Sequence, residues 1–246
     1  MRRMAVSLEL TQPSLAGRTV LVTGAGRGIG RAIARRLAAA GASVACVSRS
    51  ADQIQQTRDL VTQQGGRALA LVGDVSNDAD VQRIAEEARA TFGPIDVLIN
   101  NAGFAYLSTL ADLQPEAFEH LLSANVRSVY LCTRAAWPDL VRRRGAVVSI
   151  SSMASFDPFP GLAAYGATKS FVNLYTRGLA VEGAPHGVRA YAVAPGAVET
   201  EMLRGAFPEY PAEQTLAPDD VAALVETLLS PACRYISGQT IPINKP

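Results

Sequence analysis

Short apolar runs rich in valine and isoleucine alternate along the chain with longer segments of helical periodicity. Seven runs predict strands, at residues 19–22, 43–47, 68–72, 97–99, 146–150, 188–193 and 239–243. Six periodic segments predict helices, at residues 29–40, 51–64, 79–92, 115–143, 163–183 and 218–229. Because the strand runs are continuous rather than alternating, both faces of the sheet are expected to be covered by helices. The pattern predicts an α/β fold, a single doubly wound domain with a parallel seven-stranded sheet.

Glycines mark the ends of five predicted helices, where a left-handed residue is commonly needed: Gly41, Gly65, Gly93, Gly145 and Gly183. The domain is assigned to residues 17–246, and residues 1–16 are read as an N-terminal extension. Residues 201–217 are the least regular stretch. Since no apolar run approaches the ~20 residues of a membrane span, we expect a soluble cytoplasmic protein that does not bind a membrane.

Composition and charge exclude several classes of function. The 246 residues are 48% hydrophobic, and 23 basic side chains balance 22 acidic ones, so no basic excess favours nucleic acid or anionic lipid. Cys46, Cys132 and Cys233 lie far apart in apolar runs, which predicts free thiols in a reducing compartment. His120 and His186 lack partners at metal-ligand spacing, so no metal site is expected and both are assigned to the surface or to helix ends.

The first predicted strand leads directly into a glycine-rich turn that opens the first helix, with the sequence Thr23-Gly24-Ala25-Gly26-Arg27-Gly28-Ile29-Gly30. Glycines let the backbone approach a pyrophosphate, and the helix N-terminus supplies free N–H groups and a partial positive charge. The alternative is a turn that only packs the helix on the strand. We expect a dinucleotide to contact Gly24, Arg27, Gly28, Ile29 and Gly30.

The end of the second predicted strand bears on the choice of dinucleotide. A site for NAD usually has an acid there to hold the ribose 2′-hydroxyl, but this chain has Ser48 and Arg49. Arg49, together with Arg27, has the geometry to clamp a 2′-phosphate. The sequence therefore predicts NADP(H) as the preferred cofactor, with NAD(H) as the other option. A solvated surface arginine is the competing interpretation of Arg49.

Polar residues follow the third and fourth predicted strands. Asp74, next to Val75, offers an acceptor for an adenine amino group, and a helix cap or turn is an equally good interpretation. Asn101, Ala102 and Gly103 close the fourth strand in a way that suits a backbone bending around a ligand. A plain turn stabilised by the asparagine is the alternative.

Tyr165 and Lys169 are four positions apart on a predicted helix, so both project from one face. An ammonium group beside a tyrosine stabilises the phenolate and is expected to lower the tyrosine pKa toward neutrality. Ser152 follows the fifth strand, where its hydroxyl is suited to hold a substrate oxygen. Asn125 lies among apolar neighbours, either linking water to Lys169 or acting as an ordinary buried amide. The alternative interpretation is that Tyr165 and Lys169 are ordinary surface residues of a helix.

Taken together, these motifs resemble the short-chain dehydrogenase/reductase family from about Arg18 to Ile243. The resemblance implies a Rossmann-type fold, a catalytic triad of Ser152, Tyr165 and Lys169 completed by Asn125, and a cofactor-contacting role for Tyr165 and Lys169. It also implies that a further segment faces the nicotinamide, through Pro195, Gly196, Val198 and Thr200. The chain departs from the family pattern in two places. The stretch from residue 200 to 218 is short, and the C-terminus is Asn244-Lys245-Pro246 in place of Asp-Gly-Gly.

The resemblance implies NADPH-dependent reduction of a ketone or aldehyde, or the reverse, with 3-oxoacyl thioesters as a family-level analogy. Aromatic residues near the expected site suggest an apolar small-molecule substrate: Phe104, Tyr106, Phe156, Phe159, Phe207 and Tyr210. A dinucleotide-binding regulatory protein without chemistry is the alternative function. The apolar faces of helices 115–143 and 163–183, with the family habit of pairing them, predict a homotetramer or homodimer.

Overall fold

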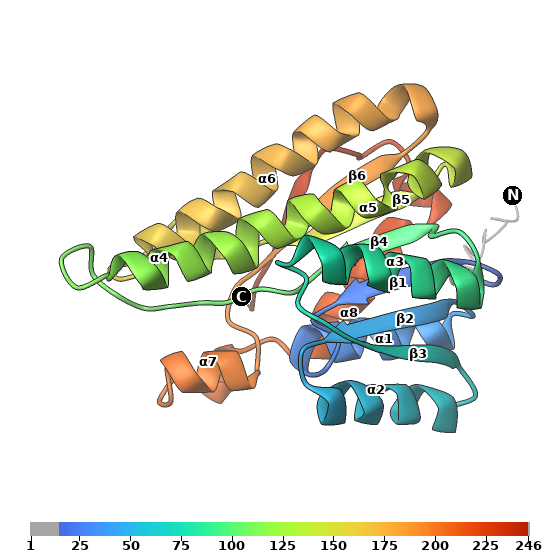
Figure 1. Ribbon diagram of the computed structural model, residues 1–246. Helices are drawn as coiled ribbons and strands as arrows, with labels where there is room; N and C mark the ends of the chain where they lie inside the picture. The colour runs from blue at the N-terminus through green and yellow to red at the C-terminus, as the bar shows by residue number, and fades with distance from the viewer. Residues whose placement is uncertain (1–14, 246) are drawn as a thin grey trace, which may run out of the picture.

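Parallel strands form the centre of the molecule in the computed structural model, which describes residues 15–245 (Figure 1). Within these residues the sheet has seven strands in the order β3-β2-β1-β4-β5-β6-β7. Their bounds are β1 Thr19–Thr23, β2 Ser43–Ser48, β3 Arg67–Val72, β4 Val97–Asn100, β5 Ala146–Ile150, β6 Arg189–Pro195 and β7 Thr240–Ile243. The predicted extension, residues 1–16, lies outside the described residues except for Leu15 and Ala16.

The strand order reverses between β1 and β4, which are hydrogen bonded to each other as well as to β2 and β5. The chain therefore winds outward from β1 to β3 on one side and from β4 to β7 on the other. Loops leaving the carboxyl ends of β1 and β4 diverge, and a crevice results at that edge of the sheet. This topology brings Thr23, Asn100 and the residues that follow them to one place.

Helices cover both faces of the sheet. Side chains of α1 (Gly28–Ala39), α2 (Ala51–Gln63) and α8 (Pro218–Leu229) share one apolar core with the strands. Those of α3 (Asp78–Phe92), α5 (Ser128–Arg143) and α6 (Ala163–Gly183) form the second core on the opposite face. In the described part of the chain, no helix has the length and apolar character needed to cross a membrane.

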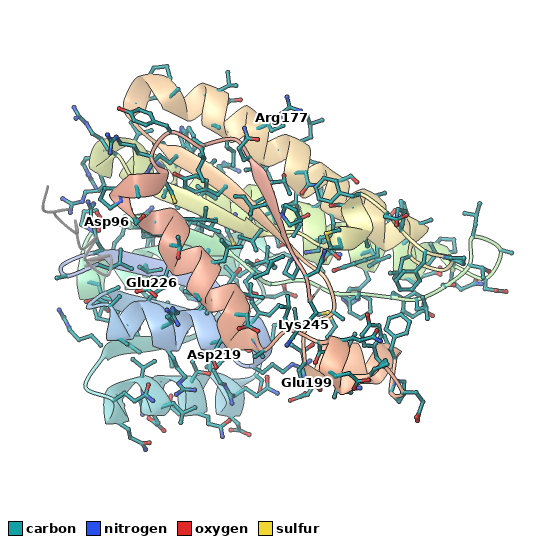
Figure 2. All side chains as sticks on the ribbon, turned by 180° about the vertical axis from the view of Figure 1, so that it is seen from behind. Asp96, Arg177, Glu199, Asp219, Glu226 and Lys245 are labelled. Carbon is teal, nitrogen blue, oxygen red and sulfur yellow. The ribbon has the colours of Figure 1, made fainter. Side chains whose placement is uncertain are left out.

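A buried carboxylate anchors the amino edge of the sheet, away from the crevice. Asp96, just before β4, is 2% exposed and accepts hydrogen bonds from Arg18, from Arg143 and from the backbone of Thr19 at 2.8–2.9 Å. Figure 2 shows Asp96 well apart from Glu199 and Lys245. The polar network at this edge therefore stabilises the fold and leaves the carboxyl edge for other contacts.

The predicted α/β class and parallel sheet are confirmed, and the predicted strands and helices agree with the observed ones to within two residues at each end. Gly41, Gly65 and Gly93 have positive φ angles as expected. The prediction is wrong for Gly145 and Gly183, because Arg144 (φ 50°) and Gly187 (φ 73°) are the left-handed residues. A side chain at Gly145 would lie 2.3 Å from the Asp96 carbonyl oxygen, and one at Gly183 would lie 2.9 Å from Val188. These two glycines therefore serve close packing.

Two predicted segments have more structure than expected. The helix predicted at residues 115–143 is α4 (Pro115–Leu122), a π-helical turn (Ser123–Arg127) and then α5, with the Ser128 N–H bonded to the Ser123 carbonyl. The widened turn contains Asn125, whose buried side chain is hydrogen bonded to neighbouring segments. The irregular stretch at 201–217 contains a short helix, α7 (Glu201–Ala206).

Candidate active site

A cleft of about 1430 Å³ opens at the carboxyl edge of the sheet. Its wall includes the glycine turn, the ends of β2, β5 and β6, the start of α6 and the α7 helix. Nearly every residue predicted to bind a cofactor or to react lines this cleft. Gly30 and Asn125 are the exceptions, and both support residues that do line it.

The glycine turn has little room for side chains. Gly24 and Gly28 have positive φ angles of 65° and 52°, and a Cβ on Gly30 would lie 2.2 Å from the Gly24 carbonyl oxygen. At the start of α1 the N-cap residue Arg27 makes no capping side-chain hydrogen bond, so the first N–H groups of this helix are left for another acceptor. Backbone so closely packed, beside an uncapped helix start, fits a pyrophosphate.

Residues from the neighbouring strand hold the turn in place. The Asn101 amide donates hydrogen bonds to the carbonyl oxygens of Thr23 (2.9 Å) and Gly24 (3.1 Å). The Thr23 hydroxyl accepts from the backbone of Asn101 and Ala102, both at 3.0 Å. On the other side, the Thr57 hydroxyl donates to the Ala25 carbonyl at 2.9 Å. Sequence reasoning read Thr23 only as the first residue of the turn and missed its hydrogen bonds to the neighbouring strand, and it missed Thr57, which nothing local connects with the turn.

The predicted pair of arginines is divided in the structure. Arg49 is exposed at the cleft and forms no ion pair within residues 15–245, whereas Arg27 forms an ion pair with Glu201 at the start of α7. Ser48 lines the cleft between them, and its hydroxyl accepts a hydrogen bond from the Ser50 N–H at 3.2 Å. In a two-arginine clamp, a 2′-phosphate would compete with Glu201 for Arg27.

Asp74 forms the turn of the alternative interpretation and also lies at the cleft. Its carboxylate accepts hydrogen bonds from the Ser76 N–H (2.9 Å) and hydroxyl (2.8 Å), as in a turn stabilised by an aspartate. It also lines the cleft, beside Val75. The N-cap of α3 is instead Asn77, which accepts from the Asp80 N–H at 3.2 Å.

Ser152, Tyr165 and Lys169 converge in the cleft from the end of β5 and the start of α6. Lys169 is buried, and its ammonium donates a hydrogen bond to the Ile150 carbonyl at 2.9 Å. Its nitrogen lies 5.8 Å from the centre of the Tyr165 ring. Burial lowers the pKa of Lys169 to about 8.

The expected lowering of the Tyr165 pKa is wrong for this structure. Burial of the phenol raises its pKa, and a hydrogen bond with Ser152 opposes this increase. The ammonium of Lys169 faces the ring of Tyr165 and is bonded to a backbone carbonyl, so desolvation of the phenolate dominates. Tyr165 is therefore held in its protonated form at neutral pH.

Asn125 lies behind this group and makes no hydrogen bond to the Lys169 ammonium. Its amide oxygen accepts from the Phe104 N–H at 2.8 Å, and its nitrogen donates to the Phe104 carbonyl (2.8 Å) and the Thr168 hydroxyl (3.1 Å). The side chain thus behaves as the satisfied buried amide of the alternative interpretation. A Cβ on Gly103 would contact both the Asn125 oxygen (2.9 Å) and the Lys169 nitrogen (3.4 Å), which shows how tightly this corner is packed.

The other end of the cleft is aromatic. Four of the six predicted aromatic residues line it, namely Phe104, Phe159, Phe207 and Tyr210. Phe159 and Phe207 meet edge to face with ring centres 5.6 Å apart. His120, assigned to the surface from sequence, is exposed but also lines the cleft and packs 4.6 Å from the Phe104 ring. His120 lies two residues before the end of α4, and its sequence neighbours gave no indication that it lines the cleft.

The segment after β6 closes the remaining side. Pro195 ends the strand, and Gly196, Val198 and Thr200 line the cleft. Val198 pairs with Leu216 in an isolated bridge, which brings the two ends of the α7 segment together. Thr200 caps α7 by accepting a hydrogen bond from the Leu203 N–H at 3.2 Å.

Comparison with known proteins covers most of the chain. A family model described as short chain dehydrogenase matches residues 18–211. The 3-oxoacyl-[acyl-carrier-protein] reductase FabG of Escherichia coli (strain K12) is 33% identical over 237 residues, which cover 93% of this chain and 96% of that protein.

Two solved structures agree in fold and sequence. A short chain dehydrogenase from Burkholderia cenocepacia J2315, in complex with NADP, is 35% identical with a TM-score of 0.86, covering 94% of this chain and 97% of that one. The 3-ketoacyl-(acyl-carrier-protein) reductase from Brucella melitensis, complexed with NADH, is 34% identical with a TM-score of 0.87, covering 94% and 98%. With the glycine turn and the Ser-Tyr-Lys group in one cleft, these matches establish that the chain belongs to the short-chain dehydrogenase/reductase family of oxidoreductases.

Proposed function

We propose that the protein is an NADP(H)-preferring oxidoreductase that interconverts an apolar carbonyl compound and the corresponding secondary or primary alcohol. The observation that carries this proposal is the convergence of Ser152, Tyr165 and Lys169 in the same cleft as the glycine turn. A regulatory protein that only binds dinucleotide would not need a buried lysine and a protonated tyrosine beside each other.

The cofactor end of the cleft supports a nicotinamide dinucleotide. Solved relatives carry NADP in one case and NADH in another, so both remain substrates to test. The backbone around Gly24 and Gly28 is suited to the pyrophosphate, and Arg49 with Ser48 is suited to a 2′-phosphate. A bound nicotinamide supplies or accepts the hydride in the reaction.

The chain's own residues would handle the proton and the substrate oxygen. In the reducing direction, Tyr165 donates its phenolic proton to the carbonyl oxygen, and Ser152 donates a hydrogen bond to the same oxygen. The raised pKa of Tyr165 keeps that proton in place at neutral pH. Lys169 in its charged form stabilises the phenolate that results, and Asn125 acts by holding Phe104 and Thr168 around it.

The substrate class rests on the aromatic end of the cleft. Phe104, Phe159, Phe207 and Tyr210 favour an apolar chain or ring over a charged compound. The Escherichia coli relative is named as a 3-oxoacyl reductase, so 3-oxoacyl thioesters belong in the first substrate panel.

The assembly we propose is a homodimer or homotetramer formed by one domain, residues 17–246, in the cytoplasm. Exposed apolar side chains on α5 and α6 support association: Tyr130, Leu174 and Val181 are 46%, 69% and 75% exposed. The buried thiols of Cys46 and Cys132 fit a reducing compartment.

Replacing Tyr165 tests the chemistry. Tyr165→Phe keeps the ring and removes the proton, so turnover of carbonyl substrates with NADPH should fall by at least ~100-fold while dinucleotide affinity changes little. Tyr175→Phe, on the same helix but outside the cleft, is the matched control and should keep wild-type turnover. Full activity in Tyr165→Phe would refute the mechanism, and a wild type that binds NADPH but reduces no carbonyl in a broad screen would favour the regulatory alternative.

A further inference from the structure

One arginine makes most of the side-chain contacts that hold together residues 199–217, the α7 segment. The Arg204 guanidinium pairs with both carboxylate oxygens of Glu199 and donates hydrogen bonds to the carbonyls of Pro208 (3.2 Å) and Tyr210 (2.6 Å). Thr215 also donates a hydrogen bond to Glu199, at 3.3 Å. Because these contacts lie within the segment, they hold it together as one unit.

The α7 segment stands away from the sheet and forms one side of the cleft (Figure 1). Two side-chain contacts link it to opposite walls. At the aromatic end Phe207 packs against Phe159, and at the cofactor end Glu201 forms an ion pair with Arg27 of the glycine turn. The ion pair joins Arg27, a candidate cofactor residue, to the segment that forms the substrate side of the cleft.

Arg27 lies between Ser48 and Thr200, as the close contacts of the two glycines on either side of it show. A Cβ on Gly26 would lie 2.7 Å from the Ser48 hydroxyl, and a Cβ on Gly28 would lie 3.2 Å from the Thr200 methyl group. The long side chain of Arg27 therefore starts midway between the end of β2 and the start of α7. In this structure it extends to α7 and pairs with Glu201, rather than toward Ser48 and Arg49.

From this geometry we propose that Glu201 is a specificity-determining residue, which weakens binding of dinucleotides that carry a 2′-phosphate. The inference rests on the proposed dinucleotide function and deepens it. A 2′-phosphate held at Ser48 and Arg49 would compete with Glu201 for the Arg27 guanidinium. A dinucleotide with a free 2′-hydroxyl leaves the ion pair intact, so the α7 segment stays attached to the glycine turn.

The expected size of the effect follows from exposure. The side chains of Arg27 and Glu201 are 53% and 68% exposed, so their ion pair is of the solvent-screened kind. Ion pairs of this kind change a binding constant by about two- to fivefold. We therefore expect Glu201→Gln to tighten binding of a 2′-phosphorylated ligand by about two- to fivefold at low salt, and by less at high salt.

Isothermal titration calorimetry with 2′,5′-ADP and 5′-AMP tests this without any turnover, since the two probes differ only in the 2′-phosphate. Glu201→Gln should tighten 2′,5′-ADP selectively and leave 5′-AMP unchanged. Glu213→Gln removes the same charge from an exposed position of the α7 segment that has no ion pair within residues 15–245, and it should change neither affinity. In an Arg27→Gln background, the Glu201→Gln change should lose its effect.

The proposal is overturned if Glu201→Gln changes both ligands equally, changes neither, or acts no differently from Glu213→Gln. It is also overturned if the effect persists without Arg27. Those results would leave the proposed oxidoreductase function standing, because binding of both probes by the wild type would still show an intact dinucleotide site. If the wild type binds neither probe, the dinucleotide site itself fails and both proposals fall together.

Discussion

Lys169 offers a direct test of how burial shapes the candidate active site. Its amine is buried with a pKa of about 8, compared with an ordinary value of 10.5, because desolvation disfavours the charged form. Between these two values the unfolded chain binds a proton that the folded chain has released. Raising the pH through this window therefore stabilises the folded protein.

The magnitude follows from the two pKa values. Integrating the linkage relation from pH 7 to pH 9.5 gives about 2 kcal/mol of stability gained through this one group. We expect Lys169→Met to lose that gain, so the stability of the wild type relative to the variant should rise by about 2 kcal/mol over this range. The lost hydrogen bond to the Ile150 carbonyl adds a cost that does not depend on pH, so it cancels from the comparison.

Urea unfolding at fixed protein concentration, repeated at half-unit steps from pH 7 to pH 9.5, measures the difference. The upper limit is set below the pKa of Tyr165, which burial raises. The chain has only two lysines, so Lys245→Met is a matched control at an exposed position and should follow the wild type at every pH. A constant difference between wild type and Lys169→Met across the range would refute the reasoning.

Three further predictions concern the turn, the cofactor and the assembly. Gly30→Ala should destabilise the fold by about 1–3 kcal/mol and weaken 2′,5′-ADP binding, because its methyl group would meet the Gly24 carbonyl at 2.2 Å. Gly205→Ala, in open space, should do neither, and equal urea midpoints for the two variants would contradict this. The double change Ser48→Asp and Arg49→Ala should reverse a preference for NADPH over NADH in paired dissociation constants, and an unchanged ratio would show that Arg49 faces solvent. Light scattering at micromolar concentration should give a dimer or tetramer, whereas a monomer would disprove the association through α5 and α6.

Local sequence patterns were sufficient for most of the fold. Strands and helices follow from runs and periodicities within 4 to 21 residues, and these are properties that neighbouring side chains share. The glycine turn and the Tyr165–Lys169 spacing were readable for the same reason, since each lies within one turn or one helix. The sequence therefore placed the candidate residues on the carboxyl edge of the sheet, where the structure brings most of them into one cleft.

Contacts between distant segments decided the rest. Asn101 holds a turn 77 positions earlier, and Glu201 pairs with Arg27 across 174 positions, distances over which no local pattern carries information. Whether the pKa of Tyr165 is raised or lowered depends on how much water the surrounding protein removes from the phenol, which the spacing of residues alone does not specify. The role of Gly145 and Gly183 likewise depends on close contacts with Asp96 and Val188, which the pattern at a helix end does not specify. The sequence by itself determined most of the elements and which groups are candidates for the chemistry, because both depend on neighbouring residues, whereas only the tertiary structure decided how those groups are paired, buried and charged.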